Sequence, residues 1–250
     1  MAAPLPSFFR RVALDQTTST NDEALKRARE GAPEGMLVTA RRQTAGRGRR
    51  GREWVSPPGN LHLSIVLRPD GGLAAATAIG FAAALAARDA MIHVLPTGAP
   101  VTLKWPNDVL IGGAKAAGLL IEAAGEDALV LGVGINVVAH PEDAPYPATS
   151  IRAAGGEAAD EDVLCAFCAS FGARYDRFRA NGMAELRADW LAHAQGLGAA
   201  IGVNIEGARF DGIFAGIDEA GALLLDLGGA GTRTVTAGDV FFAAGQRAEA

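Results

Sequence analysis

Hydrophobic positions in residues 1–194 alternate between the periods of strands and helices. Residues 61–67 alternate apolar and polar side chains with a period of two, which predicts a strand with one strongly apolar face. Residues 73–94 are rich in alanine and predict a long buried helix, too weakly hydrophobic to span a bilayer. The same reasoning predicts further strands at residues 35–40, 101–105, 116–123 and 129–138, and further helices at residues 20–30, 161–181 and 183–193. This pattern is typical of an α+β fold in which a mixed β-sheet has flanking helices.

Several positions mark where these elements begin or end. Thr20 and Glu23 have the three-residue spacing of a capping box, so we expect their side chains to cap the helix that begins there. Pro106 fixes the turn that ends the strand before it. Gly112 and Gly113 predict a hairpin turn into the next strand.

The character of the chain changes after residues 196–198. From residue 201 to residue 242, short apolar runs are separated by turn residues rich in glycine and aspartate. The runs predict about five strands, which in so short a segment indicate a small SH3-like β-barrel. We therefore expect a larger domain of residues 1–194 and a C-terminal β-barrel domain of residues 195–250.

The composition is that of a folded protein with an acidic net charge. Hydrophobic residues make up 49% of the chain and charged residues 20%, which is enough to bury a sizeable core. The formal net charge of −5 argues against non-specific binding to nucleic acid or to acidic membranes. Residues 1–15 lack a charged leader followed by an apolar core, and Cys165 and Cys168 are expected to be buried, reduced thiols. We therefore expect a cytoplasmic protein in which any strongly basic site is local.

A loop rich in arginine and glycine carries the strongest chemical signal. Six arginines lie between residues 41 and 52, interleaved with Gly46, Gly48 and Gly51, and Trp54 follows at once. Glycine lets the backbone approach a ligand, arginine binds phosphate or carboxylate oxygens bidentately, and an indole ring can stack on a base. A solvated charge run and an RNA-binding arginine–glycine segment are the alternatives. The position of the loop between two strands of an acidic domain favours a small ligand that carries phosphate.

Two of the three lysines of the chain lie in one short segment. Lys104 begins the sequence Lys-Trp-Pro-Asn-Asp, which places an ammonium, an amide and a carboxylate at the end of a strand. The alternative is an ordinary strand-ending turn. Lys115 begins the next strand, and its alternative is a solvent-facing lysine beside a hairpin.

Gly132 and Gly134 interrupt the apolar strand expected at residues 129–138. Glycines inside a strand commonly mark a close approach by a ligand or by another part of the backbone. Taken alone, these two glycines are a weak signal.

Together, the motifs resemble those of the biotin–protein ligase family. The resemblance rests on residues 19–21, 43–54, 104–108, 115–118 and 134–136, in that order, and it extends over nearly the whole chain, including the C-terminal barrel. It implies an enzyme that forms biotinyl-5′-adenylate from biotin and ATP with Mg²⁺. Such an enzyme then transfers biotin to a specific lysine of the biotin carboxyl carrier domain of a biotin-dependent carboxylase.

The resemblance also assigns roles to individual residues. Biotin would be bound by Ser19, Thr20, Asn21, Gln43, Gly46, Arg47, Gly48, Arg49, Lys115 and Gly118. ATP would be bound by Arg47, Arg49, Arg50, Trp54, Lys104, Asn107 and Asn136, with Trp54 covering the adenine. The catalytic residues would be Lys115, Arg49 and Asp108, of which Lys115 stabilises the charge that develops as the carboxylate attacks phosphorus. Asp108 would either orient the metal or receive the proton of the carrier lysine, and the sequence leaves both roles open.

Two features depart from the family pattern. Ala116 and Ala117 are smaller than the residues expected after the lysine, which predicts a looser wall of the site. Some relatives carry an arginine near the end of the last barrel strand, where this chain has Phe242, Ala243 and Ala244. The sequence therefore gives the barrel no clear part in ATP binding.

Three other interpretations of the sequence compete with this hypothesis. Some relatives carry an N-terminal helix-turn-helix domain, but Ser19 already belongs to the motifs and eighteen residues cannot hold such a domain. We therefore expect a monofunctional enzyme that binds neither DNA nor membranes. A lipoate or octanoate ligase is the nearest competing enzyme, and the arginine-rich loop favours biotin over it. An RNA-binding module is the alternative from another class, and a homodimer formed through a free sheet edge is left open.

Overall fold

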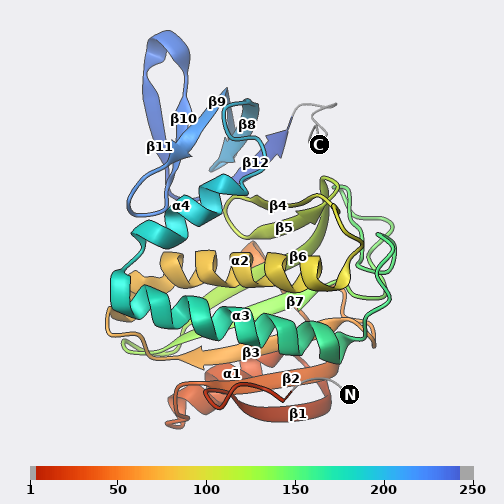
Figure 1. Ribbon diagram of the computed structural model, residues 1–250. Coiled ribbons are helices and arrows are strands. Elements are labelled where there is room, and N and C mark those ends of the chain that lie inside the picture. The colour runs from red at the N-terminus through yellow and green to blue at the C-terminus, as the bar shows by residue number, and fades with distance from the viewer. Residues whose placement is uncertain (1–3, 243–250) are drawn as a thin grey trace.

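The computed structural model describes residues 4–242 and contains two β-sheets (Figure 1). The larger sheet has seven strands in the order β1-β2-β3-β7-β6-β5-β4. β1 (Arg10–Thr17) runs parallel to β2 (Met36–Gln43), and the other neighbouring strands are antiparallel. The remaining strands are β3 (Leu61–Leu67), β4 (Val101–Lys104), β5 (Asp108–Ile111), β6 (Ala114–Ala123) and β7 (Leu129–Ile135). The expected mixed sheet is confirmed.

Helices cover both faces of this sheet. α1 (Thr20–Arg29) packs against β2, β3 and β7 on one face. α2 (Ala76–Val94) packs on the other face after the short 3₁₀ turn η2 (Gly72–Ala75), and α3 (Asp160–Asn181) and α4 (Ala184–Ala192) pack against α2 (Figure 1). The α+β fold class is confirmed.

β3 has the predicted bounds but is buried on both faces rather than one. Leu63 and Ile65 face the main core beneath α2, whereas Val66 belongs to a second apolar cluster beneath α1. His62 and Ser64 are also buried, on the same side as Val66. Because alternate side chains of a strand point to opposite faces, the polar positions of β3 lie beneath α1, where the functional site forms.

Two strands of the larger sheet were not expected from the sequence. β1 is an edge strand with mostly exposed side chains, so it lacks the apolar alternation that identifies a half-buried strand. β5 follows the Pro106–Asn107 turn directly, and its four residues are too few to show a period of their own. It forms a hairpin with β4 that pairs Lys104 with Asp108.

The segment Gly72–Val94 has the length and hydropathy of a membrane-spanning helix. However, 67% of its most apolar stretch is buried inside the protein, where α2 lies between the sheet and α3. Its alanines, among them Ala82, Ala83, Ala86 and Ala87, allow close packing and are almost completely buried. The expectation of a buried core helix is confirmed.

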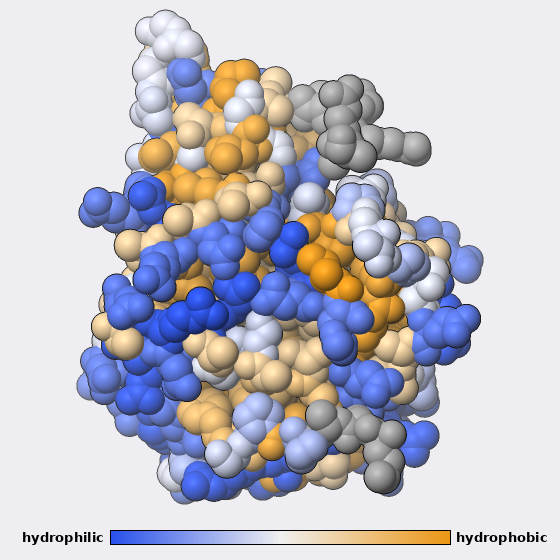
Figure 2. All heavy atoms as spheres, in the orientation of Figure 1, coloured by the Kyte–Doolittle hydropathy of each residue, from blue (hydrophilic) through white to orange (hydrophobic). Residues whose placement is uncertain are grey.

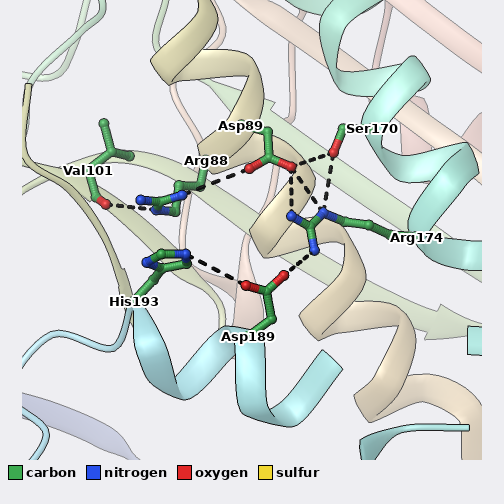
Figure 3. Close-up of polar contacts among 7 residues, drawn as sticks. All are labelled: Arg88, Asp89, Val101, Ser170, Arg174, Asp189 and His193. Carbon is green, nitrogen blue, oxygen red and sulfur yellow. Dashed lines mark hydrogen bonds and ion pairs between the residues drawn. The ribbon is translucent and has the colours of Figure 1, made fainter. Parts of the chain in front are cut away.

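A polar cluster fastens the three helices of this face to one another (Figure 3). Arg174 of α3 contacts Asp89 of α2 at 2.8 Å and Asp189 of α4 at 2.5 Å. The Ser170 hydroxyl donates a second hydrogen bond to Asp89. Arg88 donates to the carbonyl of Val101, which links the cluster to β4. Since each group has a partner of opposite charge or polarity, the cluster is explained by helix packing.

Both cysteines lie on α3, and Cys168 is completely buried. Burial raises the pKa of the Cys168 thiol to about 12, so the thiol remains protonated at neutral pH. A thiol in this state is a poor nucleophile and metal ligand. The expected burial is confirmed for Cys168, whereas Cys165 is only partly buried.

The C-terminal unit is an antiparallel sheet with the strand order β11-β10-β9-β8-β12. Its strands are β8 (Ala200–Ile205), β9 (Ala208–Ile217), β10 (Leu223–Asp226), β11 (Thr232–Val235) and β12 (Asp239–Phe242), with the 3₁₀ turn η3 (Gly228–Ala230) before β11. Trp105 donates to the carbonyl of Gly221 at 3.1 Å, and the backbones of Leu103 and Gln195 are also hydrogen-bonded. The five strands expected here are confirmed, and one apolar cluster includes buried side chains of both sheets.

The surface differs between the two units. Figure 2 shows a largely hydrophilic band over the helices and more apolar side chains over the C-terminal unit. Leu197, Ile213 and Phe241 are among the exposed large hydrophobic residues. Of these, Phe241 belongs to the wall of the functional site described below.

Candidate functional site

A cavity of about 900 Å³ lies between the larger sheet, strand β12 and the arginine-rich loop, by which we mean residues 44–54. Its wall brings together most of the residues that the sequence singled out. These are Ser19, Thr20, Asn21, Gln43, Arg47, Gly48, Arg49, Trp54, Lys104, Asn107, Asp108, Lys115 and Gly118. The fold thus gathers motifs that are far apart along the chain into one site.

Two paired glycines form a floor beneath the indole ring of Trp54. Gly118 of β6 lies opposite Gly134 of β7. A Cβ atom at Gly118 would lie 3.1 Å from the indole, and one at Gly134 would overlap it. The glycines therefore mark a close approach, as the sequence indicated, and the approaching group is a side chain of the protein itself.

Polar side chains in and behind the cavity wall form a continuous hydrogen-bonded set, which we call the polar network (Thr20, Asn21, Gln43, Ser56 and Ser64). Thr20, Asn21 and Gln43 line the cavity, Ser56 and Ser64 lie behind it, and all but the half-buried Gln43 are buried. The Ser64 hydroxyl lies 2.6 Å from Asn21 Oδ1 and 2.8 Å from Thr20 Oγ1. The Thr20 hydroxyl and backbone N–H both donate to Gln43 Oε1, and Gln43 Nε2 donates to Ser56 Oγ at 2.8 Å. These bonds fix which way the Gln43 amide faces. The side chains of the network therefore have defined orientations before a ligand binds.

The expected capping box at Thr20 and Glu23 is wrong. The N-cap residue of α1 is Ser19, and no side chain caps the helix. The Thr20 hydroxyl donates to Gln43, and the Glu23 carboxylate pairs with Arg27. Because the polar side chains at the start of α1 do not cap the helix, they can face the cavity. Ser19 lines the cavity although it is only 2% exposed.

Two carboxylates hold Arg47, the first arginine of the loop to reach the cavity. The guanidinium lies 2.6 Å from Asp22 of α1 and 3.0 Å from Glu122 of β6. Glu122 also accepts a hydrogen bond from Asn21, at 2.7 Å. A Cβ atom at residue 132 would overlap the Asn21 amide, so Gly132 leaves the space that this arrangement needs. Arg47 therefore ties the loop to the polar network.

Arg49 faces the cavity between the loop and the β4–β5 turn. Its guanidinium donates to Asn107 Oδ1 at 3.2 Å, and Asn107 in turn donates to the carbonyl of Leu119 at 2.6 Å. Burial lowers the pKa of Arg49, and the charge of Arg50 lowers it further, whereas Asp239 and Asp108 act in the opposite direction. An arginine remains cationic at neutral pH despite such a shift, so Arg49 presents a positive charge to the cavity.

Arg50 and Arg52 bind the C-terminal unit rather than the larger sheet. Both donate to the same oxygen of Asp239, at 2.9 and 2.5 Å. Arg50 belongs to the 3₁₀ turn η1 (Arg49–Gly51) and has a left-handed backbone with φ of 56°, which costs a non-glycine residue about 1–2 kcal/mol. Burial alone would raise the pKa of Asp239, but the bond from Arg52 and the charges of both arginines lower it below its usual value. Asp239 is therefore ionised at neutral pH.

Lys115 is a closely surrounded cation of the cavity wall. Its ammonium lies 2.7 Å from Asp108 Oδ1, and it lies 5.6 Å from the centre of the Trp54 ring and 5.3 Å from that of Tyr146. One carboxylate and two aromatic rings therefore hold this positive charge in place. The solvent-facing alternative is excluded because the Lys115 side chain is only 18% exposed.

Lys104 lies near Lys115 but in a more apolar setting. Its ammonium contacts the Phe242 ring at 5.6 Å. Burial lowers the pKa of Lys104, Asp108 counteracts this, and the neighbouring Lys115 lowers the pKa further. The two lysines thus concentrate positive charge at the β4–β5 hairpin.

Three residues expected to bind ligands lie outside the cavity wall. Gly46 packs against the Trp54 backbone, and a Cβ atom there would lie 2.6 Å from the Trp54 carbonyl oxygen. Arg50 is turned toward Asp239. Asn136 is buried behind the wall and donates to the carbonyl of Thr149 at 3.0 Å. None of the three lines the cavity, and their contact with a ligand stays a prediction.

The looser wall expected from the two alanines after Lys115 is also wrong. Ala116 and Ala117 are completely buried in the main core and do not line the cavity. Their small size therefore affects the packing of β6 and not the shape of the site.

Sequence reasoning missed several residues of the site. Ser64 and Glu122 carried a usable signal, because each is a polar residue within an apolar strand. Tyr146 and Asp239 lie in loop-like or weakly patterned segments and carried none. Strand β12 contributes Asp239, Val240, Phe241 and Phe242 to the cavity wall. The C-terminal unit thus takes part in the site, although the sequence gave it no clear role.

Family comparisons agree with this arrangement. The family described as "Biotin/lipoate A/B protein ligase family" matches residues 13–137, and "Biotin protein ligase C terminal domain" matches residues 196–243. The chain is 43% identical over 242 residues to the biotin–[acetyl-CoA-carboxylase] ligase of Paracoccus denitrificans, covering 92% of this chain and 99% of that protein. It is 36% identical to the bifunctional ligase/repressor BirA of Bacillus subtilis, covering 85% of this chain and 68% of that protein.

A solved structure shows the same fold. The biotin protein ligase of Aquifex aeolicus in complex with biotin and ATP superposes with a TM-score of 0.79 at 27% identity. The match covers 93% of this chain and 97% of that chain. Since both sequence and fold match over nearly their whole lengths, this chain belongs to the biotin protein ligase family.

Proposed function

We propose that this enzyme forms biotinyl-5′-adenylate from biotin and ATP and then transfers the biotin to a lysine of a biotin carboxyl carrier domain. The observation that carries the proposal is a single cavity whose wall joins a buried polar network to a cluster of arginines and lysines. Uncharged donors and acceptors suit the ureido ring of biotin, and cations suit its carboxylate and the phosphates of ATP. Both substrates therefore have complementary groups within one cavity.

Biotin is proposed to bind against the polar network. Thr20, Asn21 and Gln43 supply hydroxyl and amide groups that are already oriented by the bonds of the network, and Ser19 adds a hydroxyl in the cavity wall. A site of this kind rejects analogues that lack the matching groups, because its buried polar atoms would lose their partners. Gly118 and Trp54 offer the flat apolar surface along which the rest of the molecule lies.

ATP is proposed to bind beside the lysines and the arginine-rich loop. Arg47, Arg49, Lys104 and Lys115 supply positive charge, Gly48 and Asn107 supply polar contacts, and Trp54 supplies a ring for the adenine. Arg50 and Asn136, which lie outside the wall, contribute indirectly. The carboxylate of biotin and the α-phosphate would then meet between Arg49 and Lys115.

In the first step, a carboxylate oxygen of biotin attacks the α-phosphorus of ATP. A new oxygen–phosphorus bond forms while the bond to pyrophosphate breaks, and pyrophosphate leaves with the electron pair. Lys115 is proposed to stabilise the negative charge of this transition state, since its ammonium is already fixed by Asp108. Arg49 neutralises charge on the same oxygens and keeps the reactive product bound.

Mg²⁺ is the metal expected with ATP, and the chain offers it few ligands of its own. Among residues 4–242, no group of three or more His, Cys, Asp or Glu side chains is arranged to hold a metal. This fits Mg²⁺, which commonly binds through one or two carboxylates together with the phosphates of the substrate. Asp108 is the proposed protein ligand, because its buried Oδ1 has an ionic contact with Lys115 but accepts no hydrogen bond within the part of the chain described here. When bound, the ion would neutralise phosphate charge.

In the second step, the amine of the carrier lysine attacks the carbonyl carbon of the adenylate. An amide bond forms and AMP leaves, and Asp108 is proposed to receive the proton of the amine. The partner is a carrier domain of a biotin-dependent carboxylase, as the name of the Paracoccus relative suggests. We place the reaction in the cytoplasm, and we assign residues 1–194 to the catalytic domain and residues 195–250 to the C-terminal domain.

The test is ATP–pyrophosphate exchange with biotin, lipoate and octanoate supplied separately to the purified chain. We expect exchange with biotin and little with the other two acids. Transfer is then measured with a purified carrier domain and with a carrier in which the acceptor lysine is replaced by arginine. Exchange with lipoate but not with biotin would overturn the proposal.

The competing functions fit the site less well. The matched family includes lipoate ligases, but lipoate has no ureido group to use the polar network. An RNA-binding loop would present free arginines to solvent, whereas all four arginines of residues 47–52 have partners on Asp22, Glu122, Asn107 or Asp239. Biotin-independent, salt-sensitive retention on RNA would support the RNA-binding function instead.

A further inference from the structure

We infer that Asp239 is a positioning residue that holds the arginine-rich loop over the bound adenylate. The inference rests on the proposed function for the identity of the ligand, but the anchor itself is a feature of the ligand-free fold. It assigns the C-terminal unit a part in the reaction that does not require an arginine at the end of its last strand.

In the anchor, one carboxylate oxygen accepts hydrogen bonds from two arginine side chains, and we call this arrangement the clasp. Arg50 and Arg52 both reach Asp239 Oδ2, at 2.9 and 2.5 Å. The Asp239 side chain is 24% exposed, against 46% for Arg50 and 59% for Arg52. The carboxylate is therefore the better-shielded partner in both ion pairs.

The arginines of the loop have divided roles. Arg47, Arg49 and Arg52 line the cavity, whereas Arg50 lies outside the cavity wall. The left-handed backbone of Arg50 turns this side chain away from its neighbour and toward β12. A left-handed position is normally given to glycine, and Gly51 is next to it. An arginine at this position is explained if its side chain is needed as an anchor.

Asp239 lies on a strand that is hydrogen-bonded to its neighbour. It begins β12, where it is paired with Asn204 of β8. The rings of Phe241 and Phe242 on the same strand contact the Lys104 ammonium in the cavity wall. A carboxylate on such a strand can hold a loop in place, whereas a carboxylate on another loop would move with it.

The loop is thus fixed on two sides, with glycines between the anchors. Arg47 is held by Asp22 and Glu122 of the catalytic domain, and Arg50 and Arg52 are held by Asp239 of the C-terminal unit. Loss of Asp239 leaves only the inner anchor. The outer half of the loop would then open, and a bound adenylate would escape before a carrier arrives.

The first experiment tests the anchor without any ligand. Asp239→Asn keeps the shape of the side chain and removes its charge, and trypsin digestion followed by mass spectrometry measures cleavage after the arginines of the loop. We expect severalfold faster cleavage at Arg49, Arg50 and Arg52 than in the unmodified protein. Asp211→Asn, which removes the exposed partner of Arg209 in the same unit, is the matched control and should leave cleavage of the loop unchanged.

The second experiment measures how fast biotinyl-adenylate leaves the enzyme, by rapid gel filtration without a carrier. We expect release about tenfold faster in Asp239→Asn, with the maximal rate of adenylate formation changed less than threefold, and near-complete rescue in Asp239→Glu. Arg50→Gln combined with Arg52→Gln should reproduce the effect from the other side of the clasp. Adding Asp239→Asn to that double variant should bring no further increase.

The results of the two experiments distinguish a failure of the Asp239 anchor from a failure of the proposed function. Unchanged digestion and unchanged release in Asp239→Asn overturn the clasp, as does slower release with a lower KM for ATP, which would make Asp239 a competitor of the substrate. If the unmodified chain makes no adenylate from biotin, the proposed function fails, and the digestion alone still decides whether Asp239 anchors the loop.

Discussion

Two regions of the cavity wall present polar groups in opposite ways. The polar network is buried: Ser64 is 0% exposed, and Thr20 and Asn21 are each 4% exposed. The arginine-rich loop is open to solvent, and its outer ion pairs have arginines 46% and 59% exposed. Groups of the network bond to one another within residues 20–64, whereas the loop binds carboxylates on α1, β6 and β12.

This difference suits the two regions to different tasks: the network to recognition of the ligand, and the loop to closure of the cavity. A buried polar group without a hydrogen-bond partner destabilises the fold, so the groups of the network hold one another in a single arrangement. A ligand binds only if its own donors and acceptors match that arrangement. Exposed ion pairs contribute only about 0–1 kcal/mol each, so the loop can open and close again at little cost. If the proposed function holds, we expect the network to decide which ligand binds and the loop to decide how long the product stays bound.

The largest effect is expected for Lys115, which lies where the two regions meet. Lys115→Gln should reduce adenylate formation roughly a hundred- to a thousandfold, because one preorganised charge is lost from the transition state. Pyrophosphate exchange measures the rate, and circular dichroism checks the fold. Lys26→Gln, a change on the exposed side of α1, is the control and should leave exchange unaltered. Normal exchange in a folded Lys115→Gln protein would remove Lys115 from the mechanism.

The network is tested by filling the space that one glycine leaves. Gly132→Ala places a Cβ atom against the Asn21 amide and forces it away from Ser64 and Glu122. Overpacking of this kind costs about 1–3 kcal/mol, so biotin should bind roughly ten- to a hundredfold more weakly by calorimetry.

The matched control for this change is Gly80→Ala in α2. A Cβ atom there meets only Ile121 at an ordinary 3.5 Å. Alanine is favoured over glycine inside a helix by about 1 kcal/mol, so this variant should bind biotin normally and unfold at a slightly higher temperature. Equal loss of biotin affinity in both variants would contradict the role of the network.

The loop is tested by removing one guanidinium from the cavity side. Arg49→Gly should release the adenylate about tenfold faster, since one charge-assisted hydrogen bond contributes about 1.5–3 kcal/mol. Free adenylate acylates exposed lysines, so serum albumin incubated with enzyme, biotin and ATP should become biotinylated on a blot. Arg49→Lys should give intermediate labelling. If Arg49→Gly forms adenylate but labels albumin no more than the unmodified enzyme, the loop is not the seal.

The smallest effect is expected from salt. Raising the ionic strength from 0.1 to 1 M shortens the screening length from about 10 Å to about 3 Å, which weakens the exposed pairs of Asp239. Trypsin cleavage of the loop should rise about two- to threefold, whereas biotin affinity should change less than twofold. The comparison between the two regions fails if biotin affinity is the more salt-sensitive quantity.

The sequence by itself determined the elements whose signal is local. Period-two alternation predicted β3 with its observed bounds, and turn residues predicted the five short C-terminal strands. The motifs also pointed to most of the cavity wall, because glycine, arginine and lysine in a fixed order leave a recognisable pattern. Where the pattern was weak, as in the exposed edge strand β1 and the four-residue β5, the prediction failed.

Only the tertiary structure decided which polar groups meet. The Thr20 hydroxyl, expected to cap α1, binds Gln43 of β2 instead, and Arg50, expected to bind ATP, binds Asp239. The two residues of the second pair are 189 positions apart, and no local pattern at either one indicates the other. A hydrogen bond or an ion pair depends on distances of a few ångströms between side chains. Those distances are set by the packing of sheets and helices, which local sequence periodicity does not describe.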